Sequence, residues 1–278
     1  MPGFIAARRK GTDMKIFALL TLAAVPAFAQ AAAKGKTEVT WYGHAAFVVK
    51  APGGTTLAID PWISNPANKD KTAIEKIQKL DYILISHGHF DHVGDAIALQ
   101  KKTGAKIVAS FELGSALGAA GLPKEASGFD TLGNAGGVLQ LNDEVTVALV
   151  PAVHSSSFQA AENGPLLYAG APLGFIVQIK GGPTLYHTGD TAYFAEMKHI
   201  GDRFHPDVLL ACIGGHFTMD PADAALAARD TGAKSVVPMH YGTFPVLTGT
   251  PEELARALKK SAPRGKMVQL KIGETRTF

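Results

Sequence analysis

The segment from Ile85 to Asp95, which reads ISHGHFDHVGD, constrains the fold of this chain more than any other stretch. Three of the ten histidines and one aspartate fall within six residues of it, namely His87, His89, Asp91 and His92. The apolar run DYILIS before them is typical of a strand buried on both faces, and VGDAIALQKK after them has helical spacing. We therefore expect a polar loop at the rim of a sheet, between a buried strand and a helix.

The spacing within this loop favours metal binding. His87 and His89 are two residues apart, and side chains at that spacing in extended backbone point to the same side, so both imidazoles can reach one ion. Asp91 and His92 follow where the chain turns toward the helix, and they can serve a neighbouring position. These candidate ligands suit two adjacent ions better than one, because a single ion rarely takes all its ligands from so short a segment.

Closure of such a site needs nitrogen and oxygen ligands from elsewhere in the chain. Three strand-like runs end in a suitable residue: VTVALVPAVH ends at His154, TLYHTGD at Asp190 and SVVPMH at His240. Polar residues at the ends of apolar strands collect at one rim of a sheet. The sequence therefore predicts a metal site that combines these three residues with the histidine-rich loop.

The rest of the pattern predicts a mixed α/β protein in which strand-like and helix-like segments alternate. Strands are expected at 37–43, 45–50, 55–60, 81–86, 144–152, 173–180, 184–190, 207–213, 234–240 and 266–270. Helices are expected at 72–80, 93–102, 191–204, 220–231 and 250–260. No break in composition suggests a second domain, so we expect two sheets between helices.

The N-terminal region has the features of an export signal. Residues 15–29 read KIFALLTLAAVPAFA, which is a lysine, an apolar run and small residues in the order of a secretory signal. The run is short and contains Pro26, which argues against a membrane-spanning helix. We therefore predict a signal peptide over 1–29, a linker over 30–36 and one domain over 37–278. The mature protein is expected in the periplasm or secreted, without a stable membrane anchor.

Charge and cysteine content limit the partners. The chain has 27 basic and 24 acidic residues, but residues 1–29 hold four of the basic ones and one of the acidic ones. The remainder is balanced, so its charge gives no general attraction to nucleic acid, and we expect a small-molecule substrate. The single cysteine, Cys212, excludes an intramolecular disulfide. The sequence does not decide the oligomeric state.

The run HGHFDH, followed in order by His154, Asp190 and His240, resembles the metallo-β-lactamase superfamily from about Thr37 onward. The resemblance implies an αββα sandwich of two mixed sheets flanked by helices. It also implies two divalent ions with Asp190 bridging them. His87, His89 and His154 would hold the first ion, and Asp91, His92 and His240 the second.

Several residues indicate the branch of this superfamily. The best-known dinuclear β-lactamases carry a cysteine where Asp190 stands, whereas Cys212 lies in an apolar run and is expected in the core. The segments WYGHAAF (41–47), GGHFTMDP (214–221) and MHYGTFP (239–245) resemble a group of poorly characterised metal-dependent hydrolases related to ascorbate-6-phosphate lactonases. Phe90 departs from the family loop, which more often has a small or polar residue there, so pocket shape cannot be transferred from relatives.

This resemblance implies a dinuclear hydrolase, and the signal-like segment predicts that it is exported. Two divalent ions can hold a bridging hydroxide at neutral pH, which would attack a small ester, lactone or phosphodiester, with Asp190 orienting it. Zinc is the default for a histidine-rich site, with manganese, iron and nickel as alternatives. The competing hypotheses are a non-catalytic metal-binding protein of the same fold and a β-lactam or thioester hydrolase. RNA processing is disfavoured by the export signal and the balanced charge.

Further polar residues have two interpretations each. His44 either lines the pocket and donates to a substrate oxyanion, which would be catalytic, or is a hydrogen-bonded structural histidine. His216, between a glycine pair and a helix start, is either a catalytic pocket residue or a loop residue. Asp60 either orients a ligand histidine or forms a turn before Pro61, and Tyr241 either contacts substrate or packs. The remaining histidines, His187, His199 and His205, are predicted to be structural or on the surface.

Overall fold

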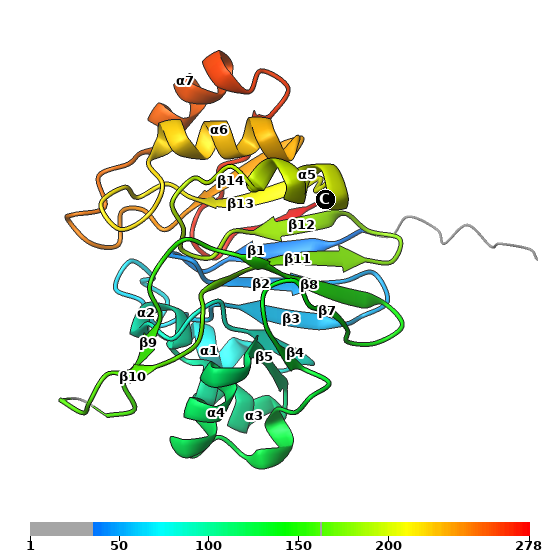
Figure 1. The fold of residues 1–278 in the computed structure, drawn as a ribbon, viewed down its shortest axis with the longest axis vertical. Helices are drawn as coiled ribbons and strands as arrows, with labels where there is room; N and C mark the ends of the chain where they lie inside the picture. Colours follow the sequence, from blue (N-terminus) through cyan, green and yellow to red (C-terminus); the bar gives the residue numbers. More distant parts are fainter. Residues whose placement is uncertain (1–35, 162) are drawn as a thin grey trace, which may run out of the picture. The chain divides into compact units, whose positions relative to one another are not determined.

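Two mixed β-sheets pack against each other across a shared core, and helices flank the outer face of each sheet (Figure 1). The structure is a computed structural model that describes residues 36–161 and 163–278. The predicted signal peptide (1–29) and all but the last residue of the predicted linker (30–36) lie outside these ranges. In the described part of the chain, no helix combines the length and the apolar character needed to cross a membrane.

The first sheet has seven strands in the order β16-β1-β2-β3-β4-β5-β6 within the described residues. These are β16 (Thr275–Thr277), β1 (Glu38–Trp41), β2 (Phe47–Lys50), β3 (Thr56–Ile59), β4 (Tyr82–Leu84), β5 (Lys106–Ser110) and β6 (Leu132–Gly133). Strands β3 to β6 run parallel, and β16 to β3 pair antiparallel. The sheet is therefore mixed, as predicted.

The second sheet also has seven strands in the described part of the chain, in the order β15-β14-β13-β12-β11-β8-β7. These are β15 (Lys266–Met267), β14 (Ser235–Met239), β13 (Val208–Cys212), β12 (Thr184–His187), β11 (Leu173–Ile179), β8 (Val145–Pro151) and β7 (Val138–Gln140). A separate hairpin of β9 (Ser157–Phe158) and β10 (Leu167–Tyr168) projects beside the first sheet's helices.

The pleat of the strands explains the layers. In β3, Leu57 and Ile59 join the core between the two sheets, while Ala58 between them faces the opposite side. Ile83 and Leu84 of β4 divide in the same way. Since both faces of these strands are buried, they read as continuous apolar runs rather than as alternating ones.

Helices cover the outer faces of both sheets (Figure 1). The helices on the first sheet's side are α1 (Ala73–Lys76), α2 (Phe90–Val93), α3 (Ala96–Thr103) and α4 (Phe111–Ala119), and those on the second sheet's side are α5 (Met197–Phe204), α6 (Pro221–Thr231) and α7 (Pro251–Ser261). Leu99 of α3 and Leu113 of α4 are buried with Ile107 of β5. Ala224 of α6 and Leu254 of α7 join the core that contains the second sheet. The predicted αββα architecture is therefore confirmed.

Two predicted helices are shorter than expected. α1 ends at Lys76 because the chain becomes extended at Ile77, which is buried together with Leu80 in the core of the first sheet. α5 begins only at Met197, since Thr191 and Ala192 are engaged with another loop: the Val153 amide donates to the Thr191 hydroxyl, and the Ala192 amide donates to the Val153 carbonyl. Tertiary contacts have overridden helical spacing in both segments.

Four strands bring the predicted ligands to one rim. β12, β13 and β14 are parallel, and β8 has the same direction because β11 runs antiparallel to both β8 and β12. β8, β12 and β14 therefore end at the same edge of their sheet, just before His154, Asp190 and His240. β4 of the other sheet delivers the histidine-rich loop, and the core between the sheets joins the two halves.

Candidate metal centre

The loop after β4 presents its side chains through a strand end and a single helical turn. His89 is the extended residue before α2 (φ −67°, ψ 150°), and Asp91 and His92 lie in that turn. Gly94 ends the turn at φ +39°, and a Cβ there would lie 2.6 Å from the Trp62 backbone, so only glycine fits. The chain must reverse tightly here, and this reversal holds the ligands close together.

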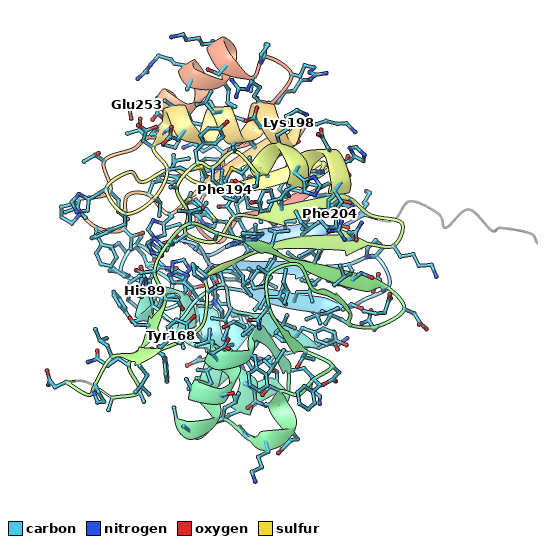
Figure 2. The ribbon with its side chains drawn as sticks, viewed as in Figure 1. His89, Tyr168, Phe194, Lys198, Phe204 and Glu253 are labelled. Carbon is cyan, nitrogen blue, oxygen red and sulfur yellow. The ribbon has the colours of Figure 1, made fainter. Side chains whose placement is uncertain are left out.

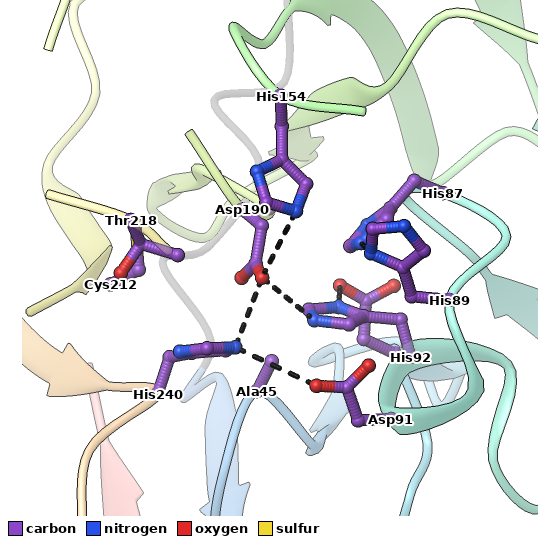
Figure 3. Close-up of polar contacts among 12 residues, drawn as sticks. Ala45, His87, His89, Asp91, His92, His154, Asp190, Cys212, Thr218 and His240 are labelled. Carbon is purple, nitrogen blue, oxygen red and sulfur yellow. Dashed lines mark hydrogen bonds and ion pairs between the residues drawn. The ribbon is translucent and has the colours of Figure 1, made fainter. Parts of the chain in front are cut away.

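The predicted ligands meet at one place, shown in Figure 3. Their donor atoms form three overlapping groups, and within each group all donor atoms lie within 4.8 Å of one another. The groups are His87, His89 and His154; His44, Asp91, His92 and His240; and His87, His92 and Asp190. The first two match the two predicted ligand sets, with His44 added to the second, and the third joins Asp190 to both halves of the site.

The Asp190 carboxylate lies at the centre of these groups (Figure 3). Its Oδ2 atom is 3.0 Å from His240 Nε2, 3.3 Å from His92 Nε2 and 3.7 Å from His154 Nε2. Nevertheless, His92 Nε2, His240 Nε2 and Asp190 Oδ1 are buried without a properly directed hydrogen bond. Buried polar atoms normally have partners, so atoms that converge without bonding one another fit a shared cation. Nitrogen and oxygen donors of this kind suit zinc and similar divalent metals.

Asp60 fixes the orientation of His92. Its Oδ2 atom is 2.8 Å from His92 Nδ1, and its two oxygens also accept from the Ser86 amide and hydroxyl at 2.7 Å. The proton on Nδ1 leaves Nε2 free to face Asp190. Asp60 also has φ +44° immediately before Pro61, so both interpretations of this residue apply: it forms the turn and orients a candidate ligand.

His44 is buried and contacts Asp91 rather than open space. Its Nε2 atom is 3.0 Å from Asp91 Oδ2, and its Nδ1 atom is 3.0 Å from Thr243 Oγ1. Burial lowers the pKa of His44 to about 4, so the neutral ring donates from Nε2 to the carboxylate and accepts from the Thr243 hydroxyl. An oxyanion donor needs a free N–H, so the arrangement favours the structural alternative over the predicted catalytic role.

His216 lies outside the three ligand groups. It is exposed at φ +56° in the loop between β13 and α6, with its ring 4.4 Å from the Phe217 ring. The same loop is tied to the site, because the Met219 amide donates to the Thr191 carbonyl next to Asp190. The loop is therefore positioned by the site, while the catalytic role of His216 stays a prediction.

The other residues singled out in the sequence have structural surroundings. His187 is buried, lies 3.0 Å from the Ala45 carbonyl through Nε2 and accepts from the Gly189 amide. Tyr241 stacks on Trp41 with 5.5 Å between ring centroids. His199 and His205 are exposed, and Cys212 is buried, where burial raises the pKa of its thiol to about 11. Phe90, by contrast, is 69% exposed beside the ligands.

Burial keeps three of the candidate ligand imidazoles neutral. Desolvation lowers the pKa of His87 well below its usual value, and it also lowers the pKa of His89 and His154. These rings are therefore neutral at pH 7, and a neutral imidazole is the form that binds a cation.

His92 differs from these histidines because it forms a charged pair with Asp190. Burial would lower the pKa of His92, but the carboxylates of Asp190 and Asp60 outweigh it and raise that pKa well above its usual value. Burial would raise the pKa of Asp190, but His240 and His92 hold it well below the usual range. In the metal-free protein, His92 is therefore protonated, and its positive charge partly balances the carboxylates that a metal ion would otherwise balance.

Known proteins resemble this chain over most of its length. The Beta-lactamase superfamily domain matches residues 55–241. A UPF0173 metal-dependent hydrolase of Anaeromyxobacter sp. (strain K) is 60% identical over 232 residues, which cover 83% of this chain and 84% of that protein. The chain belongs to the UPF0173 metal-dependent hydrolases of the β-lactamase superfamily. A further UPF0173 member, from Myxococcus xanthus, is 54% identical over 245 residues, covering 88% of this chain and 85% of its own.

Solved structures agree with this membership. Igni18, a metallo hydrolase of the archaeon Ignicoccus hospitalis, has a TM-score of 0.75 and 37% identity, covering 87% of this chain and 98% of its own. This UPF0173 member is thus a metal-dependent hydrolase with the metallo-β-lactamase fold, which confirms the resemblance seen in the sequence. The assignment of individual ligands to each ion stays a prediction.

Replacing Asp60 should weaken metal binding without unfolding the protein. In Asp60→Asn the side chain tolerates the left-handed backbone and can still accept from Ser86, but its NH2 group would face His92 Nδ1. That contact favours the tautomer with a proton on Nε2, the atom that faces Asp190. We expect metal affinity to fall about 10–100-fold in competition with a chelator. The exposed Asp202→Asn is the control, and equal affinity of both variants would contradict the orienting role.

Metal binding at pH 7 should release at least about one proton, because the raised pKa keeps His92 protonated in the metal-free protein. The affinity for metal should therefore increase as the pH rises, until His92 is neutral without metal, and it should fall as the pH is lowered. Titration calorimetry of zinc binding in two buffers of different ionisation enthalpy measures the released protons. Heats that do not depend on the buffer would show that no ligand loses a proton.

Proposed function

We propose that this UPF0173 member hydrolyses a small ester, lactone or phosphodiester outside the cytoplasm, with two divalent ions, most simply zinc. The central position of Asp190 carries the proposal, since its carboxylate contacts candidate ligands from both halves of the site. The signal-like sequence of residues 15–29 supports export to the periplasm or beyond.

In this proposal, each ion takes ligands from both halves of the molecule, because the loop after β4 belongs to the first sheet and His154 and His240 follow strands of the second. His87, His89 and His154 would hold the first, Asp91, His92 and His240 would hold the second, and Asp190 would contribute to both. If bound there, two divalent ions would supply Lewis acidity that lowers the pKa of a water and stabilises negative charge on the substrate. Asp190 remains ionised because its pKa is held well below the usual range, so it can accept a hydrogen bond from the attacking water and orient it.

A neighbouring serine, Ser156, supports the histidine-rich loop. The Ser156 hydroxyl donates to the Ala169 carbonyl at 3.2 Å and accepts from the Gly88 amide at 3.2 Å. Its hydrogen bonds are thus used in holding the ligand loop, which argues against a serine nucleophile. His44 holds the Asp91 carboxylate, since its Nε2 atom is 3.0 Å from Asp91 Oδ2.

The class of bond is tested with a panel of lactones, thioesters, phosphodiesters and β-lactams on zinc- and manganese-loaded protein. We expect turnover of esters, lactones or phosphodiesters that stops when a chelator removes the metal and returns when metal is added. Turnover restricted to β-lactams would favour the competing substrate class. Full metal occupancy without any turnover would favour a non-catalytic metal-binding protein.

Asp190→Ala should lower kcat by at least about 10²–10³-fold, because it removes the group that orients the attacking water between the two ions. The substitution removes a buried carboxylate from the centre of the site and should leave the fold, measured by circular dichroism, largely intact. Asp202→Ala, which removes an exposed carboxylate, is the control. Wild-type turnover in Asp190→Ala would exclude the bridging role.

A further inference from the structure

A cavity of about 300 Å³ lies directly beside the candidate ligand His89. The ligand loop and α2 form one side of it, α3 adds a residue, and the β9–β10 hairpin closes the opposite side. Its apolar lining residues are Phe90, Val93, Ile97, Phe158, Ala160 and Leu166. Since His89 belongs both to the cavity wall and to a candidate metal group, a molecule in this cavity would touch the metal centre.

The lining of the cavity selects against charge. The described residues that line it include no lysine, arginine, aspartate or glutamate. Besides His89, its polar side chains are Ser157 and Gln159, which carry no formal charge. An ionised group placed here would lose hydration without gaining an opposite charge, which is unfavourable. An apolar group would instead leave water for an apolar surface, which is favourable.

The position of the hairpin is fixed against the ligand loop. At Gly88 a Cβ would lie 2.6 Å from Ala169 Cβ and 2.8 Å from the Ser157 carbonyl oxygen, so the two segments meet as closely as glycine allows. The Ser156 hydroxyl accepts from the Gly88 amide and donates to the Ala169 carbonyl. The cavity is therefore a preformed feature of the fold, as ligand sites usually are.

Phe90 lines this cavity and is also exposed to solvent. Its ring is 69% exposed, and it contacts Trp62 edge-on at 5.5 Å and Phe244 at 6.4 Å between centroids. On the opposite side, Leu166 is 70% exposed at the end of the hairpin loop. Figure 2 shows the nearby His89 and Tyr168 on the same margin of the molecule. Large apolar side chains that stay exposed around a site often serve to bind a ligand.

We propose that this cavity binds an uncharged, apolar part of the substrate, such as an alkyl chain or an aromatic ring, next to the bond that is hydrolysed. The inference rests on the proposed function, since it makes the cavity part of the same site. The volume lies at the lower end of ligand pockets, roughly 300–1,000 Å³, so the occupant is one small apolar group rather than a whole large ligand. Phe90 and Leu166 are then specificity-determining residues.

Binding of hydroxamates to the zinc-loaded full-length protein tests the cavity separately from catalysis. The series runs from acetohydroxamate to butano-, hexano- and octanohydroxamate, with benzohydroxamate as the aromatic member, and calorimetry gives each Kd. The head group binds the metal in every member, so only the tail varies. We expect affinity to rise about two- to fourfold for each added methylene until the cavity is filled.

Two substitutions alter the cavity from exposed positions, where folding is least affected. Ala160→Trp fills part of it, and Leu166→Asp places a charge in its wall. Both should flatten the dependence of Kd on tail length while acetohydroxamate binds as before. Tyr168→Asp is the matched control, because Tyr168 is 73% exposed on the same hairpin and does not line the cavity. It should keep the full dependence.

The outcomes separate the cavity from the metal centre. Tight binding of acetohydroxamate without any gain from longer tails would overturn the cavity proposal and leave the metal centre standing. Absence of binding by every hydroxamate would overturn both. The apolar wall could instead pack against a second copy of the chain. In that case Leu166→Asp would change the particle mass measured by sedimentation, and the Kd of the wild-type protein would not depend on hydroxamate tail length. That result would also overturn the proposal.

Discussion

The structure depends on a buried cluster of imidazoles and carboxylates in which several polar atoms have no hydrogen-bond partner among the described residues. Asp190 Oδ2 lies within 3.0–3.7 Å of three histidine nitrogens, and two of these nitrogens, His92 Nε2 and His240 Nε2, lack directed hydrogen bonds. Such groups would be costly inside a protein unless something neutralises and coordinates them. In the metal-free state, a proton on His92 supplies part of that charge, and bound divalent ions would supply all of it.

The fold supports this cluster with strained backbone at strand ends. His44, Asp60 and His240 have φ values of +51°, +44° and +56°, a region that non-glycine residues rarely occupy. Each follows a strand and turns its side chain into the site or against a ligand. The His240 amide donates to the His44 carbonyl at 2.9 Å, which ties two of these turns together. Local strain of this kind persists where surrounding contacts fix it, and it often accompanies function.

The sequence predicted the site better than its surroundings, for physical reasons. The ligand loop and the strand ends at His154, Asp190 and His240 stand out because polar residues interrupt buried apolar runs. The contact between His44 and Thr243 joins residues 199 positions apart, so no spacing could reveal it. The prediction left the β9–β10 hairpin unassigned, because two-residue strands have no measurable period. It also left β5 and α4 unassigned, although these elements have five and nine residues. The cavity beside His89 depends on that hairpin and was therefore also unpredicted.

Anomalous diffraction from zinc-loaded crystals tests the central claim most directly, since it counts and places the ions. The account predicts two peaks per chain on either side of the Asp190 carboxylate. One would lie among His87, His89 and His154, and the other among Asp91, His92 and His240. A single peak, or none near Asp190 in fully loaded crystals, would contradict a two-metal site.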